Sequence, residues 1–215
     1  MASYRFPTTK TASNYVQLAG NSYYPTRRSG APLGIVLHVT AGLQDLNLEG
    51  NDNSAEATAK WAINREVSWH AGVDSDSIVP CLPASYTGWQ AKGYNSRTIG
   101  LEISNLDARW DNKPEDWIEA TLRNAAKACA AWVAEYGFPL VRATQSQVDS
   151  AIASNHKFGF TYHSYLSNIR VDPGKTFPFD RFIKMVAEEL GQKPPAPSKP
   201  TPTTLKVDGS LGPAT

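Results

Sequence analysis

The sequence has little of what would place it in several large classes of protein. Only two cysteines occur in 215 residues, Cys81 and Cys129, so a disulfide framework is not indicated and we expect two buried thiols. No run of about 18 apolar residues is present, which argues against a membrane span. The formal net charge of +1 gives no electrostatic footprint of a nucleic-acid binder. The segment after Met1 contains no apolar core of a secretory signal.

The composition instead favours a packed globular domain, because 41% of the residues are hydrophobic and six are tryptophan. Two short apolar runs, Gly34–Val39 and Thr98–Ser104, are typical of central strands. Val67–Val73 and Ile78–Leu82 flank an Asp/Ser turn and predict a hairpin. Strands interspersed with helices predict an α/β fold, a single domain with a mixed central β-sheet flanked by helices.

Helix signals are clearest after Pro114, where apolar residues recur at spacings of three and four as far as Gly137. A second helix is expected from Ser54 to about Asn64, with Ala57, Trp61 and Ala62 facing inward. Two further helices are expected at Ser146–Ser154 and Pro178–Leu190. Short strands are expected at Leu140–Ala143 and near Tyr4–Phe6 or Tyr15–Leu18, and a loop is expected at Leu43–Asn53.

The last part of the chain differs in composition from the rest. Residues 191–204 contain five prolines among polar residues, which is typical of a semi-rigid linker. Residues 205–215 are too few to form a core and would be the truncated start of another module. We therefore expect one domain over residues 1–190, a proline-rich linker, and a fragment of a second domain.

Two histidines and one aspartate suggest a metal site. His38 ends the first central strand, where ligands gather in open α/β sheets. His163 lies nine residues before Asp172, which begins an Asp-Pro-Gly turn. Two imidazoles and a carboxylate match a catalytic zinc site with a fourth position open for water. Taken singly, His38 is as readily a core histidine, and Asp172 an ordinary turn residue.

Two more charged residues complete a hydrolytic arrangement. Glu102 lies inside an apolar strand, where a carboxylate is rarely buried without a partner, and it is a candidate general base. Arg170 could direct a positive charge at a developing oxyanion. The plain alternatives are a glutamate facing outward and a surface arginine. His70 could be a third imidazole ligand, but we expect it to hydrogen-bond behind the ligands or to form the wall of the substrate site. Trp89 and Tyr94 either line a groove for sugar or peptide or pack within their loop.

These motifs, in this order, resemble the type 2 N-acetylmuramoyl-L-alanine amidases over about residues 33–187. The resemblance rests on the strand ending at His38, on the segments 67–74 and 98–103, and on the run from His163 through Arg170-Val-Asp172-Pro-Gly. This family includes phage endolysins, cytosolic recycling amidases and animal peptidoglycan-recognition proteins. The segment Ala91–Asn95 is similar to one found in phage members, which makes Asn95 a candidate substrate contact.

The resemblance implies a zinc enzyme that cleaves the amide bond between N-acetylmuramic acid and L-alanine in bacterial peptidoglycan. His38, His163 and Asp172 match the metal ligands, Glu102 the general base, and Arg170 a basic position, lysine in many members, that stabilises the tetrahedral intermediate. One departure is Gln90, because many members have histidine between the equivalents of Trp89 and Ala91. This difference leaves substrate orientation and proton transfer open.

The tail from Val207 also resembles the opening of a helical peptidoglycan-binding repeat, and the proline linker fits the plan of an endolysin. We therefore expect a phage endolysin, a monomer with no nucleic-acid or membrane partner. It would be made in the host cytoplasm and act on the wall after release. The alternatives are a non-catalytic peptidoglycan-recognition protein, a cytosolic recycling amidase acting on soluble muropeptides, and a toxin delivered between bacteria.

Overall fold

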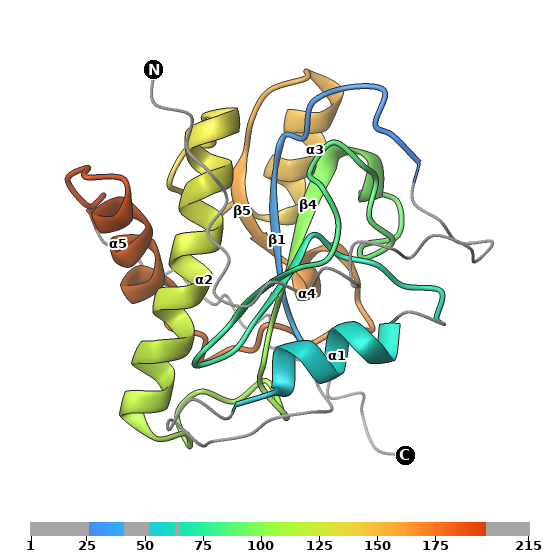
Figure 1. Ribbon diagram of the computed structural model, residues 1–215. Helices are drawn as coiled ribbons and strands as arrows, with labels where there is room; N and C mark the ends of the chain where they lie inside the picture. Colours follow the sequence, from blue (N-terminus) through green and yellow to red (C-terminus); the bar gives the residue numbers. More distant parts are fainter. Residues whose placement is uncertain (1–25, 41–51, 63–64, 197–215) are drawn as a thin grey trace, which may run out of the picture.

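The computed structural model describes residues 26–40, 52–62 and 65–196, and its central feature is one five-stranded sheet (Figure 1). The strand order is β3-β2-β4-β1-β5. Four strands run parallel, whereas β3 pairs with β2 in antiparallel fashion. The predicted mixed sheet is therefore confirmed. The strands are β1 (Gly34–Val39), β2 (Ala71–Val73), β3 (Ile78–Pro80), β4 (Thr98–Ile103) and β5 (Gly159–Tyr162).

Helices cover both faces of this sheet. On one face α2 packs against the strands and α5 packs against α2, while α1 and α3 lie on the other side (Figure 1). Among the described residues, no helix is long and apolar enough to cross a bilayer. The helices are α1 (Ser54–Ala62), α2 (Glu115–Tyr136), α3 (Gln145–Ala153), the short α4 (His163–Leu166) and α5 (Phe179–Glu189).

The ends of the long helix are set by local sequence, as predicted. Pro114 is the residue before α2, and Glu115 and Asp116 place negative charge in the first turn, where the helix dipole is positive. Gly137 ends the helix with a φ of 66°, and its N–H donates to the carbonyl of Val133. This left-handed conformation favours glycine, which explains why the helix ends there.

The alternation of side chains along β1 and β4 divides the sheet into two different faces. Successive residues of a strand point to opposite sides. Odd-numbered residues of both strands are apolar, at most 6% exposed, and join the core beneath α2 and α5: Ile35, Leu37, Val39, Ile99, Leu101 and Ile103. The even-numbered residues face the other way and include His38, Thr98 and Glu102. The same six-residue strands therefore build the core and carry polar side chains.

Several details differ from the expectations. Trp61 does not face inward but is 52% exposed, because Ala55, Ala59 and Ala62 form the buried side of α1. The predicted strand at 67–73 is ordered as a strand only from Ala71, and residues 140–143 contribute a single bridge, between Arg142 and Phe160. Both cysteines are free and buried, as expected.

Other outcomes concern segments that sequence patterns did not resolve. Strand β5 was not predicted, although it forms an edge of the sheet beside β1. The possible N-terminal strands lie outside the described residues, as do nearly all of the loop expected at 43–53, the linker beyond residue 196 and the segment 205–215. These segments stay predictions.

Candidate metal centre and active site

The register of the sheet brings three predicted site residues side by side. His38 of β1 is paired with Glu102 of β4. On the other side of β1, Leu37 is paired with Tyr162, so His163 comes next to His38 in the same register. All three side chains lie at the carboxyl ends of parallel strands, where binding sites form in open α/β sheets. Residues more than 60 positions apart therefore meet because of strand pairing.

The donor atoms of two histidines and an aspartate form a small triangle. His38 Nδ1 lies 3.0 Å from His163 Nδ1 and 3.2 Å from Asp172 Oδ2, and the third side is 3.0 Å. Ligands bound to zinc at about 2.0–2.1 Å in a tetrahedron are separated by about 3.3 Å. The triangle is close to that size, and no other group of three such side chains in the described part of the chain is so arranged. The residues present therefore fit a zinc ion.

The loop that carries Asp172 is fixed by contacts on both sides. The Ser164 N–H donates to the Asp172 carbonyl at 2.9 Å, and the Trp110 indole N–H donates to the Pro173 carbonyl at 2.9 Å. Gly174 has a φ of +104°, and a Cβ there would lie 1.8 Å from the Ala108 carbonyl oxygen. Only glycine fits this close approach, which places the Asp172 carboxylate over the sheet edge.

The electrostatics of the triangle favour a charged aspartate between two imidazoles. Burial alone would raise the pKa of Asp172, but its contacts with His163 and His38 hold that pKa well below its usual value. Burial alone would lower the pKa of His38, but the hydrogen bond with Asp172 and the nearby Glu102 raise it. Burial lowers the pKa of His163, and His38 adds to this effect. At neutral pH a carboxylate and a neutral His163 are thus available as ligands.

Glu102 lies beside this triangle and is chemically unsatisfied. Its Oε1 is 4.0 Å from His38 Nδ1, and its buried Oε2 has no hydrogen-bond partner within the described residues. Burial raises the pKa of Glu102 to about 7, while His38 opposes this shift. A carboxyl group with a pKa near neutrality can both accept and donate a proton at physiological pH. The predicted orientation of Glu102, toward the site, agrees with this geometry.

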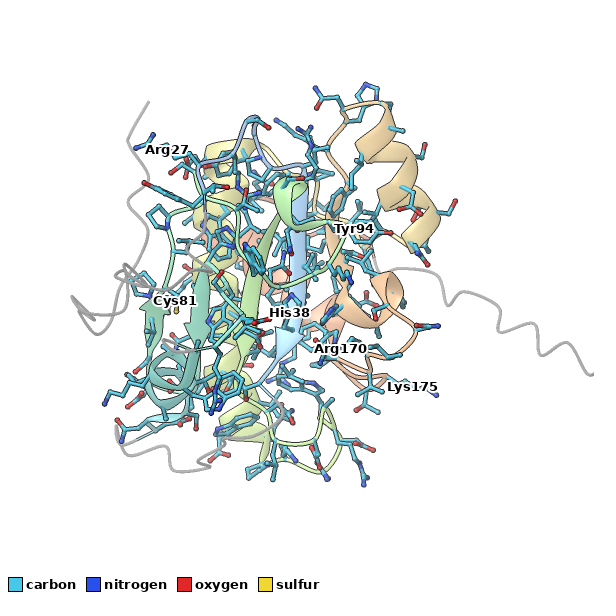
Figure 2. All side chains as sticks on the ribbon, turned by 90° about the vertical axis from the view of Figure 1, so that its right-hand side faces the viewer. Arg27, His38, Cys81, Tyr94, Arg170 and Lys175 are labelled. Atoms are coloured by element: carbon cyan, nitrogen blue, oxygen red, sulfur yellow. The ribbon has the colours of Figure 1, made fainter. Side chains whose placement is uncertain are left out.

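A cavity of about 820 Å³ opens over these residues. Its floor includes His38, Glu102, His163 and Asp172, and Arg170 lines its side. Figure 2 shows His38 at the carboxyl end of β1 with Arg170 close by. Exposed apolar side chains form much of the rim, namely Trp61, Trp89, Ile169 and Val171, which are between 42% and 82% exposed. The cavity can hold a ligand with both polar and apolar faces.

Of the four predicted substrate contacts, only Trp89 lines this cavity. His70 is 1% exposed, and its Nδ1 accepts a hydrogen bond from the Gly100 N–H. Its Nε2 lies 2.8 Å from Nη2 of Arg28 and 3.1 Å from the Tyr86 carbonyl oxygen. Burial lowers the pKa of His70 to about 3, and the Arg28 charge adds to this effect. His70 is thus a neutral residue that joins the 84–88 loop to β4.

The other two predicted contacts lie behind or away from the cavity. The Asn95 side chain accepts hydrogen bonds from the backbone N–H groups of Gln90 and Ala91, so it shapes the loop that follows Trp89. The Tyr94 hydroxyl donates to Asp149 on α3, and Figure 2 shows Tyr94 well apart from His38. Both residues hold the loop to its neighbours.

One residue at the site was not singled out from the sequence. Gln90 lines the cavity, and its Oε1 lies 2.5 Å from His38 Nε2. Its signal in the sequence is the departure noted above, glutamine where many members of the resembling family have histidine. An uncharged amide side chain does not by itself indicate a metal site or a catalytic site in a sequence. The contact with His38 is therefore visible only in the structure.

Comparison with protein families now gives the geometry a context. The profile of the Amidase_2 family, described as N-acetylmuramoyl-L-alanine amidase, matches residues 28–175. This span is more than half of the chain and includes every residue of the triangle, together with Glu102 and Arg170. The chain belongs to this amidase family. The enzyme is an N-acetylmuramoyl-L-alanine amidase, which hydrolyses an amide bond of peptidoglycan.

Solved structures support the fold of this amidase. It is similar to the Staphylococcus aureus hydrolase AmiA, solved in complex with its ligand, with 22% identity, a TM-score of 0.55, and coverage of 79% of this chain and 80% of that one. For the PlyG catalytic domain the corresponding values are 19%, 0.51, 85% and 97%. For PlyL they are 19%, 0.50, 74% and 86%. Comparison with curated proteins finds no match.

Proposed function

We propose that this amidase is a zinc enzyme in which His38, His163 and Asp172 hold the ion and Glu102 is the general base. The observation that carries the proposal is the triangle of donor atoms, with sides of 3.0–3.2 Å, beside a buried carboxyl oxygen that has no partner. Two imidazole nitrogens and one carboxylate oxygen form a donor set of the kind found in catalytic zinc sites. When bound, zinc supplies a Lewis acid that polarises a carbonyl group and acidifies a water molecule.

The protein's own residues then have distinct tasks in amide hydrolysis. Glu102 takes the proton from the attacking water and delivers it to the nitrogen of L-alanine as the amide bond breaks. The raised pKa of Glu102, about 7, suits both transfers. Arg170, on the cavity wall, presents a guanidinium to the oxygen that becomes negatively charged in the tetrahedral state.

The cavity rim is proposed to hold the peptidoglycan fragment on both sides of the scissile bond. Trp89 is 42% exposed, and the face of an indole ring can stack on the apolar side of a sugar ring. Ile169 and Val171 flank Arg170 and are largely exposed, which suits contact with methyl groups of the stem peptide or lactoyl unit. His70, Tyr94 and Asn95 are proposed to support this wall from behind.

The proposed biological setting is that of a phage endolysin acting as a monomer on the bacterial wall. This rests on the sequence resemblance and on the proline-rich segment after α5, which would tether a wall-binding module. Tethering raises the local concentration of substrate. Direct comparison of activity on intact sacculi and on small soluble muropeptides separates this setting from a recycling role.

Purified cell walls provide the test of the catalytic proposal. The zinc-loaded chain should release soluble stem peptides with new N-terminal alanine and leave free muramoyl carboxyl groups. Removal of zinc by a chelator should stop release, and added zinc should restore it. A chain that binds walls but releases no peptide under these conditions would be a recognition protein, and the catalytic proposal would be wrong.

A further inference from the structure

We propose that Gln90 is a positioning residue, which together with Thr98 fixes Nδ1 of His38 as the atom that faces the metal. The inference rests on the proposed function only in that a metal binds at His38. It concerns one chain of hydrogen bonds that runs from the carbonyl of Tyr94 through Thr98 and Gln90 to the imidazole. At each contact in this chain, the chemistry of the two groups fixes which one donates the proton and which one accepts it.

The direction starts at the backbone. The Tyr94 carbonyl can only accept, so the Thr98 hydroxyl donates its proton there, at 2.9 Å. A hydroxyl has one proton, and Thr98 Oγ1 must therefore accept at its contact with the Gln90 side chain, at 2.7 Å. The group that donates to it is the amide NH2. The two ends of the Gln90 amide are thus distinguished by Thr98.

The same direction continues to the histidine. With its NH2 turned to Thr98, Gln90 presents Oε1 to His38 Nε2 at 2.5 Å. A carbonyl oxygen only accepts, so Nε2 keeps its proton, and Nδ1 is the nitrogen whose lone pair a cation can take. That lone pair is on the side of the ring where His163 Nδ1 and Asp172 Oδ2 lie, 3.0 and 3.2 Å away. The ring therefore has one tautomer ready to bind a cation.

Gln90 is itself held firmly enough to do this. Asn95 Oδ1 accepts from the N–H groups of Gln90 and Ala91, at 3.0 and 2.7 Å. The Gln90 side chain then crosses β4 directly above Gly100, where a Cβ would lie 2.7 Å from Gln90 Cγ. Gly100 thus leaves the space through which the amide reaches His38. Groups that orient a metal-binding histidine typically change metal affinity by 10–100-fold when removed.

Gln90 also borders the cavity, and a direct substrate contact is the competing role. Both ends of its amide are already engaged inside the protein, by Thr98 and by His38. A substrate contact would show in the Michaelis constant and leave zinc binding unchanged. A positioning role shows in zinc binding with no substrate present, and this difference makes the two roles separable.

The test measures zinc affinity by competition with a chromophoric chelator, using the full chain. Gln90→Met keeps the length of the side chain but removes the acceptor, and should weaken zinc binding by roughly 10–100-fold. Gln90→Glu keeps an acceptor oxygen and should restore affinity to about the parent value or tighter, as carboxylates do beside zinc-bound histidines. Gln192→Met, at an exposed position after α5, is the matched control and should leave affinity unchanged.

Nuclear magnetic resonance gives a second readout that does not depend on affinity. In the zinc-loaded parent, the hydrogen-bonded Nε2–H proton of His38 should be protected from exchange and visible. It should be lost in Gln90→Met and weakened in Thr98→Val, which removes the hydroxyl while keeping the side-chain shape. Thr98→Val also decides the matter if Gln90→Met does not fold.

Each result of these experiments either supports or overturns the inference. If Gln90→Met keeps the parental zinc affinity and the Nε2–H signal, Gln90 is not a positioning residue. If Thr98→Val keeps both, the hydrogen-bond chain from Thr98 through Gln90 does not orient His38. Loss of both in Gln90→Met, with recovery in Gln90→Glu, supports it. A parent that binds zinc but releases no stem peptide would refute the proposed function and leave this inference intact.

Discussion

The two faces of the central sheet use the same strands for opposite purposes. Toward α2 and α5, β1 and β4 present only aliphatic side chains, which pack with helix residues into the main core. On the opposite face, the same strands present Val36, His38, Thr98, Gly100 and Glu102, of which His38 and Glu102 line the cavity. The first face is stabilised by burial of apolar surface, whereas the second holds buried polar groups that cost stability unless they are paired. The difference indicates that the core face supplies the rigidity that the polar face needs.

The polar face is not equally satisfied throughout. Thr98 and His38 take part in the chain of hydrogen bonds through Gln90. Glu102 Oε2, in contrast, is buried with no hydrogen-bond partner in the described part of the chain. Such a group destabilises the fold, and enzymes commonly retain it where it takes part in the reaction. Substitutions on the two faces should therefore separate function from stability.

The largest effect is expected from the polar face. His163→Ala removes one corner of the triangle, so the folded chain should take up no zinc under conditions that saturate the parent, and hydrolysis of cell walls should stop. Metal analysis by mass spectrometry measures the loss. His156→Ala changes an exposed histidine and serves as the control. Full zinc content in His163→Ala would show that the ion binds elsewhere.

Glu102→Gln should separate the metal from the reaction. The amide keeps the shape of the side chain but cannot take a proton, so turnover on cell walls should fall by roughly 10²–10⁴-fold while zinc content stays at the parent level. Glu135→Gln, on the exposed side of α2, should behave like the parent. Parental turnover in Glu102→Gln would remove this residue from the role of general base.

The core face should respond in stability alone. Leu122 on α2 is fully buried, and Leu122→Ala should lower the free energy of unfolding by about 2–5 kcal/mol through lost burial and a cavity. Urea denaturation measures this change. The zinc affinity of the folded protein should remain that of the parent. A large loss of zinc affinity in this variant would show that the two faces are not independent.

A smaller effect, dependent on pH, is expected at His70. Its folded pKa of about 3 is below the unfolded value of 6.5, so the unfolded chain binds a proton first as the pH falls. The stability that this neutral histidine contributes is therefore complete above pH 6.5 and is lost below it, by about 2 kcal/mol at pH 5.

His70→Asn removes the titrating group while its side-chain oxygen can still accept from Gly100. In zinc-free protein, the parent should lose about 2 kcal/mol more than this variant between pH 7.5 and pH 5, measured by urea denaturation. His156→Asn should follow the parent. Equal losses in the parent and in His70→Asn would mean that His70 is not held neutral in the fold.

Strong local patterns made much of this fold predictable. The apolar strands β1 and β4 and the long amphipathic α2, with Pro114 and Gly137 at its ends, were predicted from the sequence and are present. Strand β5 was missed because four residues beginning with a glycine at a φ of +86° give no clear alternation. Trp61 was placed wrongly because the inner side of α1 consists of alanines, which carry a weak hydrophobic signal beside a tryptophan.

The site was predictable only in part for a different reason. His38 and Glu102 could be suspected from polar residues in apolar strands, but their pairing depends on strand order, which the sequence does not state. The roles of His163, Asp172 and Arg170 came mainly from a family resemblance, since a metal site built from distant segments has no local spacing. Gln90 stood out in the sequence only as a departure from the resembling family, and its contact with His38 could not be predicted, because an amide acquires its role only from the atoms around it.

The most direct test of the account is a crystal structure of the zinc-loaded chain with anomalous diffraction measured at the zinc absorption edge. The account predicts one strong peak about 2.0–2.1 Å from Nδ1 of both His38 and His163, with Asp172 as third ligand and Glu102 facing the open position. A peak at another place, or coordination of His38 through Nε2, would contradict it.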